Sequence, residues 1–310
     1  MLVKMEEKVL IFGHKNPDTD SICSSIAMAN LEKKEGNNIE AVRLGKINKE
    51  TEYALKYFDV EETRLIERVE ENQKVILVDH NEFNQSADGI EKASIEKVMD
   101  HHRISNFQTE KPLFYFAQPV GCTSTILYEV YKMNNVEIDK KMAGLMLSAI
   151  LSDTLILKSP TCTIKDVEAA KELSKIAEVD INIYGLEMMK AGTNLDEFSE
   201  EELINMDAKR FEKNGLKYII AQVNTVDIND VLKRQSQLEE AINKTISNEN
   251  LDLFVFAITD IINCNSEIIA LGNRTDIIEK SNKLKNNRAF LEGVVSRKKQ
   301  LVPLVEKNLD

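Results

Sequence analysis

VLIFGHKNPDTD, residues 9–20, joins a short apolar run to a polar segment that holds one histidine and two aspartates. The apolar run predicts a buried strand, and the polar residues follow at its end. Two later apolar runs end in the same way: 75–78 leads into Asp79-His80, and 95–99 leads into Asp100-His101-His102. The chain has four histidines, and all of them fall at these three expected strand ends.

The first part of the chain, as far as about residue 187, alternates apolar runs with helical periodicity. Runs that are apolar throughout and separated by helices indicate a parallel sheet with helices on both faces. Ligands of such sheets bind beyond the carboxyl ends of the strands, where the histidines and aspartates lie. The expected strands are 9–12, 39–44, 75–78 and 95–99, and the expected helices are 21–34, 50–58, 121–133, 140–155 and 165–176.

The segment KAGTNLD, residues 190–196, interrupts this periodicity with Gly, Thr and Asn. We therefore expect a larger domain over 1–189, a linker over 190–196 and a smaller C-terminal α/β domain over 197–310. At 310 residues, two domains are also the natural expectation from length. For the second domain we expect helices at 199–206 and 227–247, and strands at 218–223, 253–258 and 268–271.

Composition limits the possible functions. A net charge of -12 argues against a nucleic-acid binder, because a phosphate backbone needs a basic face. The four cysteines have no CxxC spacing, which favours buried free thiols over a disulfide or a zinc site. Residues 1–8 are charged, and no run approaches the roughly 18 apolar residues of a membrane span. We expect a cytoplasmic protein with no membrane partner.

The aspartates at the strand ends have two possible roles. Each one alone could cap a following helix, and Asp20 is placed to do so. Several carboxylates in one pocket, however, repel each other unless cations compensate them. Histidine with carboxylate fits manganese, cobalt, iron or zinc better than calcium. Two ions sharing a carboxylate would hold a hydroxide ready to attack phosphorus.

Phosphoryl transfer also needs cations that hold the transferred group. GVVSRKKQ, residues 293–300, is a basic cluster in an acidic chain, and it contains Arg297 and Lys298. Lys209 is a further candidate, although alone it would be an exposed helix residue. The segment 121–125 opens a helix, and its amides could serve an anion or ordinary N-capping.

Asp100-His101-His102, together with residues 14–20 and Asp79, resembles the DHH phosphoesterase superfamily. Within it, GHKNPDTDSIC (13–23) and SRKKQ (296–300) resemble the family II, manganese-dependent inorganic pyrophosphatases. The likeness covers essentially the whole chain.

The resemblance implies a DHH domain that holds two Mn²⁺ or Co²⁺ ions, with Asp79 bridging them, and a smaller domain that supplies cations. It implies pyrophosphate as substrate, bound between the domains with Mg²⁺, and a homodimer. Asp100 would orient a histidine. The implied metal ligands are His14, Asp18, Asp20, Asp79, His101 and Asp153, and the implied pyrophosphate contacts are His102, Lys209, Arg297 and Lys298.

Two alternatives remain open. One keeps the metals and takes polyphosphate or short oligonucleotides as substrate. The Gly-Gly-Gly-His type signature of nucleases in this superfamily is absent, and no histidine follows His102. The other alternative is a metal-binding module without catalysis, which would not require the full set of ligand types at the strand ends.

Overall fold

The computed structural model describes residues 8–309, so residues 1–7 of the charged N-terminal segment lie outside the described part. The chain divides into two compact units, Met1–Gly192 and Thr193–Asp310. This boundary falls inside the segment 190–196. The helix α6 (Ile181–Gly192) occupies the first residues of that segment.

The first unit is built on a six-stranded sheet whose strands are all parallel, as predicted. Its order is β3-β2-β1-β4-β5-β6. Because β1, β4 and β5 are neighbours, the residues that follow them lie along one stretch of the carboxyl edge. The strands are β1 (Val9–Phe12), β2 (Ile39–Arg43), β3 (Arg64–Leu65), β4 (Lys74–Val78), β5 (Ser94–Asp100) and β6 (Phe114–Ala117).

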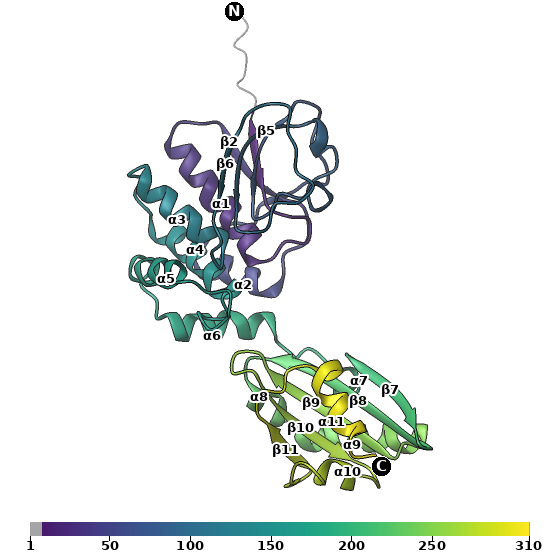
Figure 1. Cartoon of the computed structure of the whole chain (residues 1–310). Helices are drawn as coiled ribbons and strands as arrows, with labels where there is room; N and C mark the ends of the chain where they lie inside the picture. Colours follow the sequence, from purple (N-terminus) through teal and green to yellow (C-terminus); the bar gives the residue numbers. More distant parts are fainter. Residues whose placement is uncertain (1–7, 310) are drawn as a thin grey trace, which may run out of the picture. The chain divides into compact units, whose positions relative to one another are not determined.

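Helices cover one face of this sheet, where α1 packs on β1 and β2, α3 packs on β5, and α4 packs against both helices (Figure 1). The opposite face carries Phe12, Leu77 and Val98, which pack against Ile90 and Phe83. These last two belong to the one-turn 3-10 helices η1 (Phe83–Gln85) and η2 (Ile90–Lys92). The longer helices are α1 (Thr19–Lys34), α2 (Lys49–Tyr57), α3 (Thr123–Met133), α4 (Lys140–Asp153) and α5 (Ile164–Ala177).

The second unit contains a five-stranded mixed sheet in the order β11-β10-β9-β8-β7. Strands β8 and β9 are parallel, and the other neighbours are antiparallel. Helices α7 (Glu200–Asn205) and α9 (Gln235–Glu249) pack on one face, and α10 (Asp276–Glu279) and α11 (Val302–Glu306) on the other. The strands are β7 (Ala208–Lys213), β8 (Leu216–Thr225), β9 (Leu253–Asp260), β10 (Asn265–Leu271) and β11 (Arg288–Leu291).

Two predictions for the second unit are wrong. The helix expected over 227–247 is two helices, α8 (Ile228–Leu232) and α9, because Arg234 leaves the helical backbone and binds Glu200 and the carbonyl of Phe198. Lys209 lies in the edge strand β7, not in a helix. Edge strands often carry charged side chains, so AKRFEK lacks the apolar run from which a strand is predicted.

None of the helices between residues 8 and 309 combines the length and the apolar character that a membrane span requires.

Candidate metal centre

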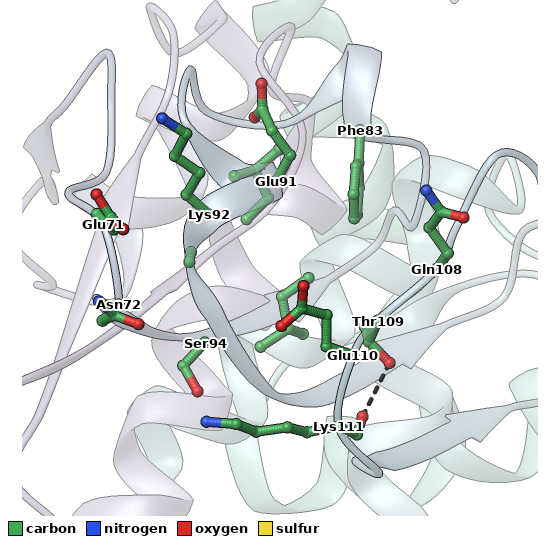
Figure 2. A pocket seen from close by; sticks show the side chains of 13 residues that line it. Glu71, Asn72, Phe83, Glu91, Lys92, Ser94, Gln108, Thr109, Glu110 and Lys111 are labelled. Atoms are coloured by element: carbon green, nitrogen blue, oxygen red, sulfur yellow. Dashed lines mark hydrogen bonds between the residues drawn. The ribbon is translucent and has the colours of Figure 1, made fainter.

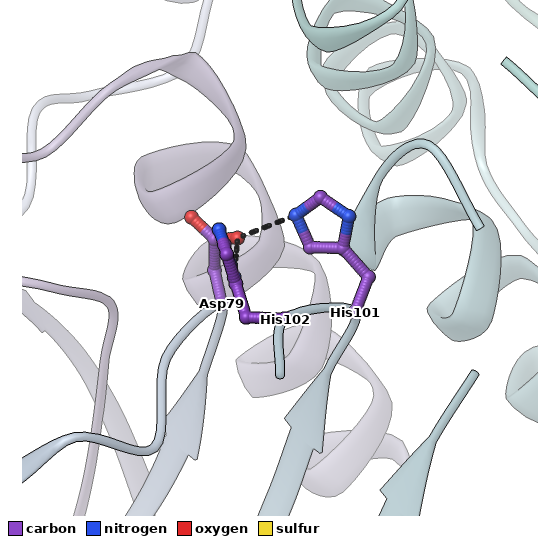
Figure 3. A group of neighbouring side chains, drawn as sticks. All are labelled: Asp79, His101 and His102. Atoms are coloured by element: carbon purple, nitrogen blue, oxygen red, sulfur yellow. Dashed lines mark ion pairs between the residues drawn. The ribbon is translucent and has the colours of Figure 1, made fainter. Parts of the chain in front are cut away.

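Asp79 lies at the centre of the carboxyl edge of the parallel sheet, directly after β4. It is buried, and its two carboxylate oxygens face different histidines. Oδ2 lies 3.4 Å from Nε2 of His14, which follows β1. Oδ1 lies 3.3 Å from Nε2 of His101, which follows β5 (Figure 3). The side chains that the sequence placed at separate strand ends therefore meet at one carboxylate.

Asp18 both caps α1 and faces this group. Its Oδ1 accepts a hydrogen bond from the amide of Ser21 at 2.9 Å, and its Oδ2 lies 3.5 Å from Nε2 of His14. Of the two roles considered for Asp20, helix capping is not the one observed, since Asp18 is the N-cap residue and Asp20 lies inside the first turn.

Asp20 instead binds the beginning of α3. It is fully buried, and it accepts hydrogen bonds from the amides of Thr123 at 2.7 Å and Ser124 at 3.2 Å. The hydroxyl of Ser24 donates a further bond to Asp20 at 2.6 Å. The first amides of α3 thus serve an anion, as one interpretation of 121–125 proposed, and that anion is a carboxylate of the same chain.

Asp153 is the last residue of α4, and its carboxylate reaches the same region. Its Oδ2 lies 4.0 Å from Nε2 of His101. One ligand atom each of Asp20, Cys122 and Asp153 lies within 4.8 Å of the others. The same limit holds for the group His14, Asp18 and Asp79, and for Asp79, His101 and His102.

All of the sequence-predicted metal ligands therefore belong to one connected cluster, in which Asp79 is shared by two of the groups. Sequence reasoning missed Cys122, because a single cysteine without ligand spacing carries no metal signal. The prediction that the cysteines are buried holds for Cys23 and Cys122, whereas Cys264 is exposed and Cys162 is partly exposed; all are free thiols.

The acids of the cluster repel one another. Burial, together with the charge of Asp79, raises the pKa of Asp20 to about 6. Burial and the charges of Asp20 and Asp79 also raise the pKa of Asp153. These shifts express the free-energy cost of holding several anions in one buried place.

Protonated histidines would relieve this repulsion. Burial lowers the pKa of His14, but Asp18 and Asp79 outweigh it and raise the pKa to about 10. His101 behaves in the same way beside Asp79, with a pKa of about 9. Burial would raise the pKa of Asp79, yet the neighbouring His101 and His14 hold this pKa well below the usual range.

The donor set fits divalent transition metals. The buried Oδ2 of Asp79 accepts no hydrogen bond from any described residue, although it lies between polar groups. Nδ1 of His101 lies 3.1 Å from the carbonyl of Val120, a contact that directs Nε2 into the cluster. Imidazole nitrogens and carboxylate oxygens in this arrangement suit manganese, cobalt, iron or zinc.

The other two histidines have different surroundings. Nδ1 of His102 lies 3.0 Å from Oδ1 of Asp100, and this bond raises the pKa of His102. Asp100 therefore orients a histidine, as expected from the resemblance. His80 lies in the interior between the carbonyl of Val78 and the hydroxyl of Ser86, and burial lowers its pKa to about 4. Of the four histidines, only His80 lies outside the cluster.

The predicted cations are in the second unit. Lys209 is exposed on β7, and Lys298 is exposed in the single π-helical turn Arg297–Leu301. Arg297 is partly buried, and its Nη1 donates to the carbonyl of Asp207 at 2.6 Å and lies 2.9 Å from Oδ1 of that residue.

A cavity of about 570 Å³ lies elsewhere in the first unit (Figure 2). Ser94, Lys92, Gln108 and Lys111 line it, so it adjoins the beginning of β5. Asp100, at the other end of that strand, lies at the carboxyl edge of the sheet, where the metal cluster is. The cavity and the metal cluster are separate sites.

Comparison with known proteins finds a matching family model for each of the two units. The family model for the N-terminal domain of the DHH family matches residues 8–150, and the model for the DHHA2 domain matches residues 186–308. The chain is 57% identical over 302 residues to the manganese-dependent inorganic pyrophosphatase of Bacillus subtilis, covering 96% of this chain and 98% of the relative.

Two solved structures are also similar. A Methanococcus jannaschii protein assigned to the family II inorganic pyrophosphatases matches with a TM-score of 0.61 and 41% identity, covering 97% of this chain and 99% of the other. An exopolyphosphatase-related protein from Bacteroides fragilis matches with a TM-score of 0.50 and 14% identity, covering 98% of this chain and 92% of the other. The second likeness concerns the fold alone.

Proposed function

The chain belongs to the manganese-dependent inorganic pyrophosphatases of the DHH family, and on that premise we propose that it hydrolyses pyrophosphate to two orthophosphates. The nucleophile in this proposal is a hydroxide held between two divalent metal ions. The observation that carries it is the carboxylate of Asp79, whose two oxygens face histidines from two different strands.

The proposed ligands divide between two ions. His14 and Asp18 would hold one ion, and Asp20, His101 and Asp153 the other, with Asp79 shared. Ligand atoms of His14, Asp18 and Asp79 lie within 4.8 Å of one another, as do those of Asp20 and Asp153, which supports this division. His101 is assigned to the second ion because its Nε2 lies 4.0 Å from Oδ2 of Asp153. The ions are Mn²⁺, with Co²⁺ as an alternative, and Mg²⁺ accompanies the substrate.

His102 is the proposed proton donor. In hydrolysis, the hydroxide oxygen bonds to one phosphorus, the bridging P–O bond breaks, and the leaving phosphate takes up a proton. Asp100 occupies Nδ1 of His102 and raises its pKa, so Nε2 can carry that proton near neutral pH. A new water molecule then gives one proton to His102, and the hydroxide that remains replaces the one consumed.

Lys209, Arg297 and Lys298 would bind the phosphoryl oxygens. Pyrophosphate is strongly anionic, and cations that face it stabilise the charge spread over the transferred group. In this proposal the substrate lies between the two units, and closure of the units excludes water. A homodimeric state and a cytoplasmic location belong to the same proposal and rest on the likeness to the family.

A phosphate-release assay with pyrophosphate, tripolyphosphate and a dinucleotide, each with Mn²⁺ or with a chelator, tests the function. We expect rapid release from pyrophosphate that requires Mn²⁺. Cleavage of the dinucleotide without cleavage of pyrophosphate would assign the chain to the nuclease branch. Binding of Mn²⁺ without release from any substrate would indicate a module without catalysis.

A further inference from the structure

The segment 293–297, which ends at Arg297 and leads into Lys298, is held in place by side chains. Oε1 of Gln300 accepts bonds from the amides of Val295 at 2.9 Å and Ser296 at 3.0 Å. The side-chain amide of Gln300 donates to the carbonyl of Gly293 at 2.8 Å. The backbone path of this segment therefore depends on particular polar side chains.

Gln222, on β8, makes the bonds nearest to Arg297. Its Oε1 accepts from the amide of Arg297 at 2.8 Å, and its Nε2 donates to the carbonyl of Val295 at 2.9 Å. Nε2 also donates to the hydroxyl of Thr259 at 2.8 Å. Gln222 is only 8% exposed, so water cannot easily replace these bonds.

The same residue is connected to the guanidinium of Arg297. The backbone amide of Gln222 donates to the carbonyl of Asp207 at 3.1 Å. That carbonyl also accepts the bond from Nη1 of Arg297 at 2.6 Å. Gln222 thus fixes the backbone of Arg297 directly and, through Asp207, the carbonyl that orients its side chain.

We propose that Gln222 is a positioning residue, which holds Arg297 and Lys298 where they can bind the phosphoryl groups of the substrate. This inference rests on the proposed function. Only a side chain with an acceptor and a donor at its end can serve both the amide of Arg297 and the carbonyl of Val295. A displacement of about 1 Å in a substrate-binding group can reduce kcat/KM by about 100-fold.

The test compares Gln222→Met with Thr259→Val. Gln222→Met keeps the length of the side chain and removes both bonds to the segment. Thr259→Val removes a bond in the same buried network, but it leaves Gln222 bonded to Val295 and Arg297. KM and kcat for pyrophosphate, binding of the analogue imidodiphosphate, and Mn²⁺ affinity are measured for each.

We expect Gln222→Met to raise KM and to weaken imidodiphosphate binding by about 10- to 100-fold. Mn²⁺ affinity should be unchanged, since the metal ligands belong to the first unit. Thr259→Val should keep KM within about twofold of the parent enzyme. Equal effects of the two substitutions, or an unchanged KM in Gln222→Met, would overturn the inference.

A double-substitution cycle with Arg297→Ala separates this inference from the proposed function. If Gln222 acts through Arg297, the fold-increase in KM of the double variant is smaller than the product of the fold-increases of the two single variants. Independent losses would refute the positioning role. An Arg297→Ala enzyme with the parent's KM would instead contradict the proposed contact of Arg297 with pyrophosphate.

Gln222→Asn provides a second variant if Gln222→Met does not fold. It remains polar, but it is one methylene too short to reach both Arg297 and Val295. The same rise in KM is expected, together with faster hydrogen exchange in peptides that cover 293–300. A parent-like KM and parent-like exchange in this variant would refute the proposal.

Discussion

Asp79 has an unusual backbone conformation for the residue on which the site depends. Its φ is +58°, in the left-handed region that non-glycine residues seldom adopt. Strain of this kind is found at functional sites, where the surrounding structure maintains it. Aspartate and asparagine tolerate this region better than most residues, so the position can be tested without disturbing the backbone.

Asp79→Asn should lose bound metal and nearly all turnover. Asparagine keeps the size of the side chain and the left-handed backbone, but it lacks the charge that two cations would share. Replacement of an outer partner of a metal ligand already costs about 10- to 100-fold, and the loss here should be larger. Metal analysis and phosphate release measure it, and full activity would remove Asp79 from the bridging role.

Asp100→Asn should change the pH dependence of kcat. The bond to Asp100 raises the pKa of His102, so the variant should have a lower His102 pKa. If protonated His102 serves the leaving group, activity is present below that pKa and is lost as pH rises through it. The basic limb of the pH–rate profile should therefore move to lower pH.

Asp139→Asn is the matched control for this profile. Asp139 caps α4 at the end of that helix opposite to Asp153, and asparagine is an equally good cap. The control should keep the parent's profile. An unshifted profile in Asp100→Asn with normal metal content would contradict the role of His102 as proton donor.

At this scale the sequence predicted which strand-end side chains lie close together. His14, Asp79 and His101 could be placed together because the ends of neighbouring parallel strands meet at one edge. His80 follows the same strand as Asp79, and its inward direction depends on Ser86, which no sequence pattern connects to it. Cys122 joins the cluster only because the beginning of α3 meets Asp20.

Among the elements, the end of α4 has a direct effect on the site. Three consecutive residues after it, Leu155, Ile156 and Leu157, have φ values of 49°, 53° and 63°. This conformation costs roughly 1–2 kcal/mol per residue for L-amino acids. The hydroxyl of Thr154 accepts a bond from the amide of Leu157 at 3.1 Å, which holds the left-handed turn directly after Asp153.

Thr154→Val should weaken Mn²⁺ binding by about 10- to 100-fold, because the turn that fixes Asp153 loses its acceptor. The substitution preserves side-chain shape and removes the hydroxyl. A titration of the metal-free protein with Mn²⁺ measures the effect.

Thr245→Val is the control for Thr154→Val. The hydroxyls of both threonines bond to the carbonyl four residues earlier, but Thr245 lies in α9 of the second unit. Its replacement should leave the affinity unchanged. Equal Mn²⁺ affinity of the Thr154→Val protein and the parent would contradict this role, because the turn would then be stable without the hydroxyl.

Sequence periodicity could not reveal this turn. The apolar pattern of α4 continues through Leu155, Ile156 and Leu157, so the helix was expected to run to residue 155. Hydrophobic spacing reports which residues are buried, and it does not distinguish a right-handed from a left-handed turn. The edge strands β3, β6 and β11 were missed for a different reason, since each is partly or wholly exposed and none forms a buried apolar run.

On the scale of the whole molecule, the metal ligands and the predicted substrate cations belong to different units. Removal of Mn²⁺ should therefore destabilise the first unit more than the second. A ligand that binds the folded state stabilises it in proportion to the logarithm of its concentration, and this effect should fall on the first unit.

Hydrogen exchange with and without a chelator tests this expectation. Peptides covering residues 9–20, 75–82 and 98–104 should lose protection when Mn²⁺ is removed. Peptides within 216–225 and 253–260 should keep theirs. Equal loss of protection throughout both units would contradict a metal centre confined to the first.

The sequence predicted the two-unit organisation and the smaller C-terminal α/β domain, because strand-like and helix-like runs change their order after about residue 196. It could not predict the edge strand β7 that carries Lys209. Nor could it predict the bonds from Gln222 to the segment around Arg297. These features depend on contacts between residues that are far apart in the sequence.

Anomalous diffraction at the manganese edge, from crystals grown with Mn²⁺, is the most direct measurement of the central claim. The account predicts two peaks for each chain, one on either side of the Asp79 carboxylate, with His14 beside one and His101 beside the other. A single peak, or peaks that do not contact Asp79, would contradict it.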